Sequence, residues 1–297
     1  MRAFTMNLLN YNANTAFPLG LLALQKQVDL RAELTRYSQG INQAPVHVAG
    51  FTEVFVAGNA FPGNVQNALN DLADALLIPV NNHNRHIAVI RCGYSALQPN
   101  GNEVVAIVLD GNATAVQHHI YWFTPGGNPN QMSIVNIGNY TAYLQQYYAW
   151  TPDYRYVVGV DFSLNGVDYN IAFFHNRQPG SNEQGVGMIF ARNLVHQNQN
   201  LLLGGDFNTG PLCANANPCV AGYHHQTTYY STLNNTTVAS NYDWWMSCNT
   251  FMVNGIAAQC DATPNVPLSI PPAINAGNVP PPIVTGSDHR GVGISIA

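Results

Sequence analysis

The chain has 297 residues, of which 46% are hydrophobic, so it is long enough to bury a large core. Only 8% of the residues are charged, Lys26 is the only lysine, and the formal net charge is −5. This balance argues against the broad basic surface of proteins that bind nucleic acid without sequence preference, so a polyanionic substrate would need metal ions and a few arginines to offset its charge. No apolar run reaches the roughly 18 to 20 residues of a transmembrane helix, and we expect no transmembrane segment.

The cysteines and the first residues give information on the cellular compartment of the protein. A strand-like pattern follows Met1 at once, so either export uses no classical signal or the signal has been removed. Five cysteines with a single lysine favour an oxidising destination, secreted or periplasmic, and Cys213–Cys219 is the simplest disulfide. The alternative is that the cysteines are buried free thiols.

Apolar strand patterns and amphipathic helical patterns alternate along the first half of the chain. In order, the spacing predicts a strand at 2–9, a helix at about 21–39, a strand at 46–55, a helix at 64–77, and strands at 86–91, 104–109 and 119–123. Helices and strands therefore mix without a regular strand–helix–strand series.

The second half begins with a predicted hairpin. Strands at 155–162 and 169–174 flank Asn165-Gly166, which has hairpin turn chemistry; a helix at 183–196 and strands at 201–205, 242–247 and 291–296 follow, with a long Pro-rich loop at 261–282. We predict an α/β (α+β) fold over residues 1–297 as a single domain, with two mostly antiparallel sheets flanked by helices.

Side chains that bind metals or transfer protons recur where predicted strands end or begin. In chain order they are Asn7, Glu53, His175, Asp206, Asn208, Asp288 and His289. Each alone has an ordinary explanation as a turn former, a cap or a solvated residue. Their ordered combination indicates one site, because strand ends hold ligands rigidly.

These residues stand in blocks that resemble the DNase-I-like endonuclease/exonuclease/phosphatase superfamily. The blocks are Thr5-Met6-Asn7, Thr52-Glu53, Phe173-Phe174-His175-Asn176, Gly204-Gly205-Asp206-Phe207-Asn208, Tyr242-Asp243 and Ser287-Asp288-His289. They follow the family's order across nearly the whole chain, although Thr52 stands where the family usually has Gln. The segment from Arg155 to Glu183 and the helix after it are similar to the catalytic subunit of cytolethal distending toxins, which implies toxin-type partner subunits.

The resemblance implies a four-layer, DNase-I-like sandwich and a set of roles. Asn7, Glu53 and Asp288 would hold the metal, which would be Mg²⁺, with Mn²⁺ or Ca²⁺ as alternatives. Asp206 and Asn208 would orient the attacking water, contact phosphate or complete a second metal position. His289 would be a phosphate-facing acid/base held by Asp243, with His175 as its counterpart. Arg155, together with Asn208 and His289, would bind the substrate phosphate.

Three functional hypotheses remain open from the sequence. The first is a metal-dependent endonuclease that hydrolyses phosphodiester bonds in DNA. The second is a phosphatase or phosphodiesterase that acts on a phosphoinositide or sphingomyelin-type headgroup, which the acidic, lysine-poor composition favours. The third is a binding protein that keeps the fold without turnover, and it would require a missing catalytic residue, which the pattern does not show.

Overall fold

The computed structural model describes most of the chain's strands and helices. The described residues are 1–12, 21–57, 63–94, 101–122, 133–138, 143–144, 155–177, 182–210, 220–224, 229–233, 236–240, 242–248, 260–262, 289 and 291–296. Within these ranges no helix is both long enough and apolar enough to span a membrane.

The first sheet has seven strands within the described residues, in the order β15-β16-β1-β2-β4-β3-β7. The strands are β1 (Arg2–Asn12), β2 (Val48–Ala57), β3 (His86–Tyr94), β4 (Gly101–Leu109), β7 (Tyr143–Leu144), β15 (Cys260–Ala262) and β16 (Val292–Ser295). β1 runs parallel to β2 and β3 parallel to β7, while the other neighbours are antiparallel. The sheet is therefore mostly antiparallel, as predicted.

The second sheet also has seven described strands, in the order β11-β14-β10-β9-β8-β5-β6. They are β5 (Thr114–Trp122), β6 (Ser133–Gly138), β8 (Val157–Leu164), β9 (Val167–His175), β10 (Leu201–Asp206), β11 (Val220–His224) and β14 (Asp243–Cys248). Only β9 and β10 are parallel. A separate two-stranded sheet pairs β12 (Tyr229–Leu233) with β13 (Thr236–Ser240).

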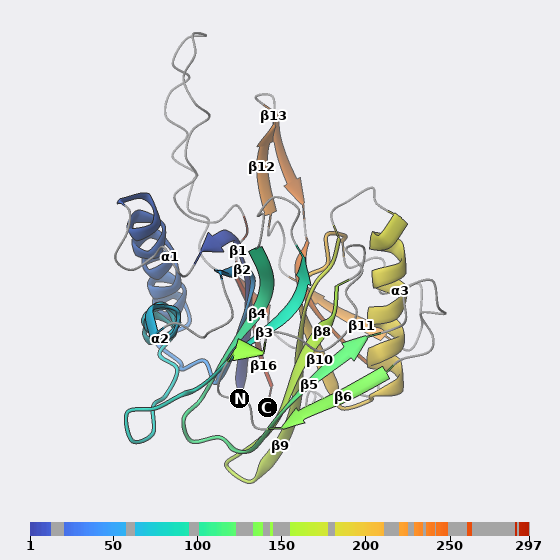
Figure 1. Cartoon of the computed structure of the whole chain (residues 1–297), viewed down its shortest axis with the longest axis horizontal. Coiled ribbons are helices and arrows are strands. Elements are labelled where there is room, and N and C mark those ends of the chain that lie inside the picture. Colours follow the sequence, from blue (N-terminus) through green and yellow to red (C-terminus); the bar gives the residue numbers. More distant parts are fainter. Residues whose placement is uncertain are drawn as a thin grey trace.

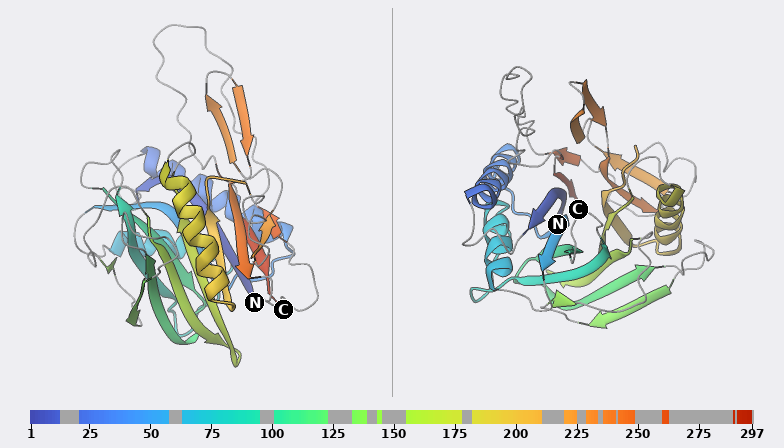
Figure 2. Two further views of the ribbon diagram at one scale, coloured as in Figure 1. Left: turned by 90° about the vertical axis from the view of Figure 1, so that its right-hand side faces the viewer. Right: turned by 45° about the horizontal axis from the view of Figure 1, so that its top comes forward.

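The two large sheets pack face to face, and helices cover their outer faces (Figure 1). α1 (Leu21–Gly40) and α2 (Gly63–Ala75) lie on the first sheet, and α3 (Asn182–Gln197) lies on the second. Figure 2 shows the same helix–sheet–sheet–helix layering in its right-hand view. The predicted four-layer α/β sandwich is confirmed.

Three buried clusters fill the spaces between the layers. Phe51 and Leu69 belong to the cluster under α1 and α2, and Phe174 belongs to the one under α3. Between the sheets, the rings of Phe173 and Trp245 pack edge to face with centroids 6.0 Å apart. Burial on both faces explains why several strands read as continuous apolar runs.

The hairpin between β8 and β9 forms as the sequence predicted. Leu164 pairs with Val167, and both turn residues have positive φ, 54° at Asn165 and 79° at Gly166. A two-residue turn of this kind matches the twist of the strands it joins, and Asn and Gly adopt the conformation at low cost.

Several predictions of detail differ from the structure or fall outside it. β1 extends to Asn12 and β2 to Ala57, beyond the predicted ends of these strands near Asn7 and Glu53, because each strand pair resumes after a register shift at that point. The short strands β6, β7, β11, β12, β13 and β15 were not predicted. The Cys213–Cys219 pairing and most of the 261–282 loop lie outside the described residues. Cys92 is a buried free thiol, as the alternative interpretation expected.

Candidate active site

One edge of the sandwich collects the candidate residues from both sheets. β9 ends at His175 and the parallel strand β10 ends beside it at Asp206, which is in register with His175. β14 runs antiparallel to β10, so its first residue, Asp243, pairs with Asp206. In the first sheet, β4 begins near this edge because it runs antiparallel to β2, which places Glu103 opposite Phe55.

A bulge in the first sheet places Asn7 and Glu53. The β1–β2 register shifts after the Asn7–Thr52 pair, and the β2–β4 register shifts between Phe51 and Val54. Glu53 lies in the second shift with φ of 52°. A bulge re-aims the side chain it carries, and a positive φ at a non-glycine residue is a strained conformation typical of functional sites.

The turn after β10 is fixed by its own polar groups. Gly205 has φ of 151°, and a Cβ there would lie 1.8 Å from the carbonyl oxygen of Phe174, so only glycine fits. The backbone N–H of Asn208 donates to Oδ1 of Asp206 at 2.8 Å, and Asn208 adopts φ of 53°. Asparagine tolerates this left-handed conformation, which explains the Gly-Gly-Asp-Phe-Asn sequence locally.

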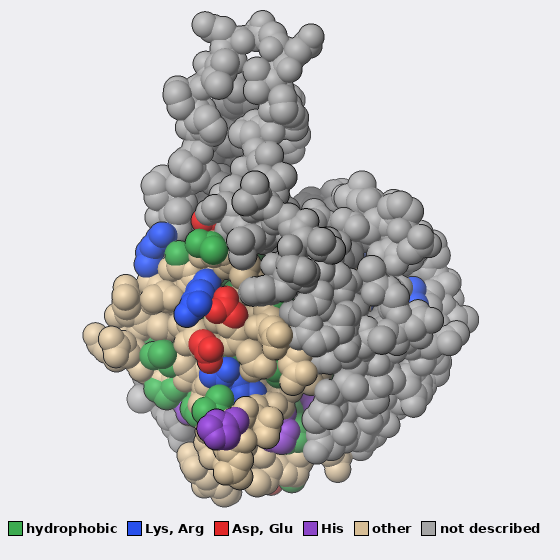
Figure 3. Space-filling model, turned by 60° about the vertical axis from the view of Figure 1, so that its left-hand side comes forward, with side chains coloured by type: hydrophobic (Ala, Val, Ile, Leu, Met, Phe, Trp, Pro, Cys, Tyr) green, Lys and Arg blue, Asp and Glu red, His purple; other side chains and the backbone are tan. Residues whose placement is uncertain are grey.

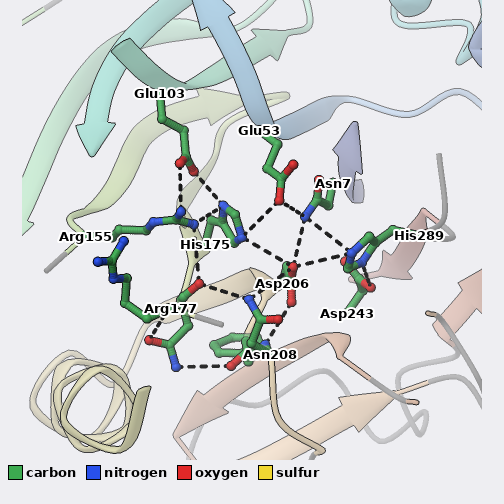
Figure 4. A network of polar contacts seen from close by, with 12 residues as sticks. Asn7, Glu53, Glu103, Arg155, His175, Arg177, Asp206, Asn208, Asp243 and His289 are labelled. Atoms are coloured by element: carbon green, nitrogen blue, oxygen red, sulfur yellow. Dashed lines mark hydrogen bonds and ion pairs between the residues drawn. The ribbon is translucent and has the colours of Figure 1, made fainter. Parts of the chain in front are cut away.

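Asp206 is the centre of the site (Figure 4). Its side chain is fully buried, and its Oδ2 accepts a hydrogen bond of 2.9 Å from Nδ2 of Asn7. The same Asn7 nitrogen donates to Oε1 of Glu53 at 3.1 Å. Nε2 of His175 lies 3.5 Å from Oδ2 of Asp206, and Nε2 of His289 lies 3.7 Å from it. The two imidazoles therefore face one carboxylate from different sides.

The His175 side of the site is an ion cluster that joins the two sheets. Nδ1 of His175 lies 2.5 Å from Oε1 of Glu103 and also contacts Nη1 of Arg155. Nη2 of Arg155 forms an ion pair of 2.9 Å with Oε2 of Glu103. With Nδ1 donating to Glu103, Nε2 of His175 is left facing Glu53 and Asp206, each 3.5 Å away.

Two opposing effects set the protonation of Glu103. Burial alone would raise the pKa of this fully buried carboxyl, but the Arg155 guanidinium and His175 act against it. Arg177 adds a smaller contribution in the same direction, and the net result is a pKa below the ordinary value of 4.5. Glu103 is therefore ionised at neutral pH and holds the His175 ring in one orientation.

The His289 side pairs the ring with an aspartate. Nδ1 of His289 lies 2.7 Å from Oδ2 of Asp243, and both side chains are buried. A carboxylate at this distance accepts a hydrogen bond from Nδ1–H and so orients the ring, with Nε2 left facing Asp206. Asp206, Asp243 and His289 each offer a ligand atom within 4.8 Å of the others, so this side also has groups that suit a cation.

The structure brings together every predicted site residue that it describes. These are Asn7, Glu53, Arg155, His175, Asp206, Asn208, Asp243 and His289. Asp288 lies outside the described residues, next to His289.

Sequence reasoning missed Glu103 and Arg177. Glu103 is the only carboxylate in β4 and directly precedes its apolar run 104–109, which could have indicated a buried ionised group. Arg177 follows directly after the His175-Asn176 block.

Comparison with known proteins agrees with this fold. No protein-family model matches the chain, and neither does any curated protein. Among solved structures, an endonuclease/exonuclease/phosphatase family protein from Leptotrichia buccalis C-1013-b is 15% identical with a TM-score of 0.57, over 100% of this chain and 99% of that one. A mannosyl-6-phosphatase from Bacteroides thetaiotaomicron VPI-5482 is 13% identical with a TM-score of 0.54, over 100% and 99%. D. rerio TDP2, complexed with a single-strand DNA product, is 13% identical with a TM-score of 0.50, over 99% and 97%. The chain therefore has the DNase-I-like fold, while the toxin resemblance stays a prediction.

Proposed function

We propose that the chain is a divalent-metal-dependent phosphoester hydrolase that cleaves phosphodiester bonds, with DNA as its favoured substrate. The observation that supports this most directly is the pair of histidines whose Nε2 atoms face Asp206 at 3.5 and 3.7 Å, each with Nδ1 on its own carboxylate. Hydrolysis of a phosphoester needs a base for the attacking water and donors for the phosphate and the leaving oxygen, and Asp206 with the two supported imidazoles would supply them.

The charges of the site suit a cation. Four carboxylates, Glu53, Glu103, Asp206 and Asp243, surround the space, against the two guanidinium groups of Arg155 and Arg177 (Figure 4). An anionic phosphate would meet repulsion there unless positive charge were added. When bound, a hard divalent cation would supply charge neutralisation and Lewis acidity. Asn7 and Glu53 would hold it together with Asp288, and oxygen donors of this kind fit Mg²⁺.

The side chains divide the remaining work. Asp206, buried and held by Asn7 and by the Asn208 backbone, would accept a proton from the attacking water. His289, oriented by Asp243, would donate a hydrogen bond to the phosphate when its ring is protonated. His175 would donate a proton from Nε2 to the leaving oxygen, which balances the proton that Asp206 takes from the water. Asn208 and Arg155 would contact the phosphate, and Arg155 does so with part of its charge already shared with Glu103.

Surface charge bears on how a DNA substrate would be held. On the face around α1 and α2, the described cationic and anionic side chains are interspersed, and none forms a basic stripe (Figure 3). Arg31 pairs with Asp71 at 2.7 Å, and Arg85 pairs with Asp74 at 2.7 Å. This face therefore offers no broad basic surface to a polyanion, and we propose that substrate is bound through a few phosphates at the site. The TDP2 structure with a single-strand DNA product supports DNA as the first substrate to assay.

A second candidate is the same chemistry on a phosphorylated headgroup. The net charge of −5 with a single lysine favours a compact substrate over a long polyanion. The similarity of the fold to that of a mannosyl-6-phosphatase supports assaying small phosphoesters beside DNA. Phosphoinositides and sphingomyelin are the lipid substrates of this class to include.

An assay panel tests the proposal. Plasmid DNA, RNA, inositol phospholipids and sphingomyelin are each incubated with Mg²⁺ or with EDTA, using the wild-type chain and Glu53→Gln. We expect Mg²⁺-dependent turnover of DNA that Glu53→Gln abolishes without changing the melting temperature, because the amide removes the charge that holds the ion. Asp168→Asn, at an exposed carboxylate of the β8–β9 hairpin, is the matched control and should retain full activity. Full activity in EDTA or in Glu53→Gln would contradict the proposal, and turnover of a lipid without DNA cleavage would favour the second candidate.

A further inference from the structure

Arg177 lies two residues after the end of β9, at the edge of the site. Its backbone N–H donates to Oδ1 of Asn176 at 2.9 Å. The amide of Asn176 in turn donates to the carbonyl oxygens of Gln184 at 3.0 Å and Phe207 at 3.1 Å. Asn176 is therefore held both by α3 and by the segment after β10, and this fixes the backbone position of Arg177 next to it.

Two residues that are proposed to contact the phosphate, Asn208 and Arg155, both bond to the backbone of Asn176. The carbonyl oxygen of Asn176 accepts hydrogen bonds from Nδ2 of Asn208 at 3.0 Å and from Nη1 of Arg155 at 3.4 Å. Figure 4 shows the Arg177 guanidinium beside that of Arg155, on the side of the site away from His289. Arg177 thus lies next to the position where a scissile phosphate would be bound.

The two arginines differ in their counter-charges. Arg155 forms an ion pair with Glu103 at 2.9 Å, whereas Arg177 affects Glu103 through longer-range attraction. Among the described residues, no carboxylate forms an ion pair with the Arg177 guanidinium, which is partly exposed. A guanidinium fork in this position suits a phosphate that it can contact through two N–H groups.

We propose that Arg177 forms a subsite for a second phosphate, namely the phosphodiester next to the scissile one along a nucleic-acid strand. The inference rests on the proposed function, because the scissile phosphate defines the first position. The Arg155 guanidinium pairs with Glu103 and would contact the scissile phosphate. The adjacent Arg177 guanidinium would contact the next phosphate along the strand. The subsite makes a nucleic-acid strand a better substrate than an isolated phosphodiester.

The kinetic test compares two substrates that differ by one phosphate. A thymidine dinucleoside monophosphate has one phosphodiester, and the trinucleotide has a flanking one. The wild-type ratio of kcat/KM, trinucleotide over dinucleotide, should fall about 10-fold in Arg177→Gln, since a charge-assisted hydrogen bond to the second phosphate is lost. Arg36→Gln, at an exposed arginine of α1, is the matched control and should leave the ratio unchanged. An unchanged ratio in Arg177→Gln would overturn the subsite.

A binding measurement separates this inference from the proposed function. Binding of a single-stranded oligonucleotide is followed by fluorescence anisotropy in EDTA over a range of salt concentrations. Arg177→Gln should make the log–log slope shallower by about 0.7, the value for one phosphate of a single strand, and Arg36→Gln should not. An unchanged slope overturns the subsite. The subsite is also overturned if Arg177→Gln weakens the binding of an inositol bisphosphate but not the binding of the oligonucleotide. Arg177-dependent binding without Mg²⁺-dependent turnover by the wild-type chain would instead overturn the proposed function.

Discussion

The two histidines of the site have different electrostatic surroundings. His175 lies in a cluster of three ionised groups, Glu103, Arg155 and Arg177, which spans both sheets. His289 is fixed by Asp243 and faces Asp206. If the proposed function holds, the arginine side would meet a phosphate with permanent positive charge, whereas the His289 side would be cationic only when the ring is protonated or a cation binds. The two rings should therefore contribute to turnover in different ways.

Removal of either imidazole ring should have the largest effect on kcat among the changes that compare the two sides. We expect His175→Ala and His289→Ala each to lower kcat by at least about 10², the usual contribution of a positioned acid or base. The measurement is steady-state hydrolysis at saturating substrate and fixed Mg²⁺. His196→Ala, at an exposed position in the last turn of α3, is the control. Wild-type rates in both His175→Ala and His289→Ala would contradict the assignment of these histidines as acid and base.

The ion cluster on the His175 side should also matter for stability. Glu103→Gln leaves the nearly buried Arg155 without its counter-charge, and we expect a loss of about 3 to 5 kcal/mol in the free energy of unfolding at pH 7, measured in urea. The folded-state pKa of Glu103 is lowered, so its stabilising effect is present above 4.5 and is lost as the pH falls through the folded-state pKa.

Measuring unfolding over a range of pH tests whether Glu103 stabilises the fold through its charge. The stability gap between wild-type and Glu103→Gln should be widest at neutral pH and should narrow as the pH falls below 4.5. Asp168→Asn, whose carboxylate is exposed, should show no such gap. A gap that stayed constant or widened on acidification would mean that Glu103 does not act through its charge.

Loss of the charge on Asp243 should have a smaller effect than loss of the His289 ring. In Asp243→Asn the ring stays in place, but the group that fixes its tautomer and the negative charge beside it are lost, because the carboxylate 2.7 Å from Nδ1 is gone. We therefore expect a kcat between those of wild-type and His289→Ala, measured by steady-state hydrolysis at saturating substrate and fixed Mg²⁺. A rate as low as that of His289→Ala would show that Asp243 is needed for more than orientation.

Salt should have the smallest effect, and it tests whether the arginine side is the main phosphate contact. KM for a short duplex, measured between about 50 and 200 mM salt at fixed Mg²⁺, should follow a log–log dependence equivalent to about one to three phosphate contacts. Arg155 and Arg177 would account for two. A log–log slope of about −5 or steeper for 1/KM would mean that several other arginines also contact the duplex.

The sequence predicted the parts of the site that are encoded in short contiguous blocks. Asp206 and Asn208 were predictable because the Asn208 backbone bonds to the Asp206 side chain two residues away, a local motif. Glu103 was missed because its partner His175 is 72 residues distant and on the other sheet, so the contact depends on how the sheets pack. Arg155 was predicted as a phosphate ligand, but its pairing with Glu103 could not be predicted for the same reason.

The fold shows the same division between local and long-range information. The Asn165-Gly166 turn was predicted because its positive φ angles are a local requirement. The full length of β1 and β2, to Asn12 and Ala57, was not predicted, since it depends on a bulge that restores pairing with neighbouring strands.

The central claim is that both histidines act on one phosphate whose attacking water is activated at Asp206. The most direct measurement is Mg²⁺-dependent hydrolysis of a single phosphodiester by Asp206→Asn, an almost isosteric change at the carboxylate that both Nε2 atoms face. We expect kcat to fall by about 10² to 10⁴ while the melting temperature and Mg²⁺ affinity stay near those of wild-type, because Asn7 and Glu53 remain. Asp206→Asn with wild-type turnover would contradict the account.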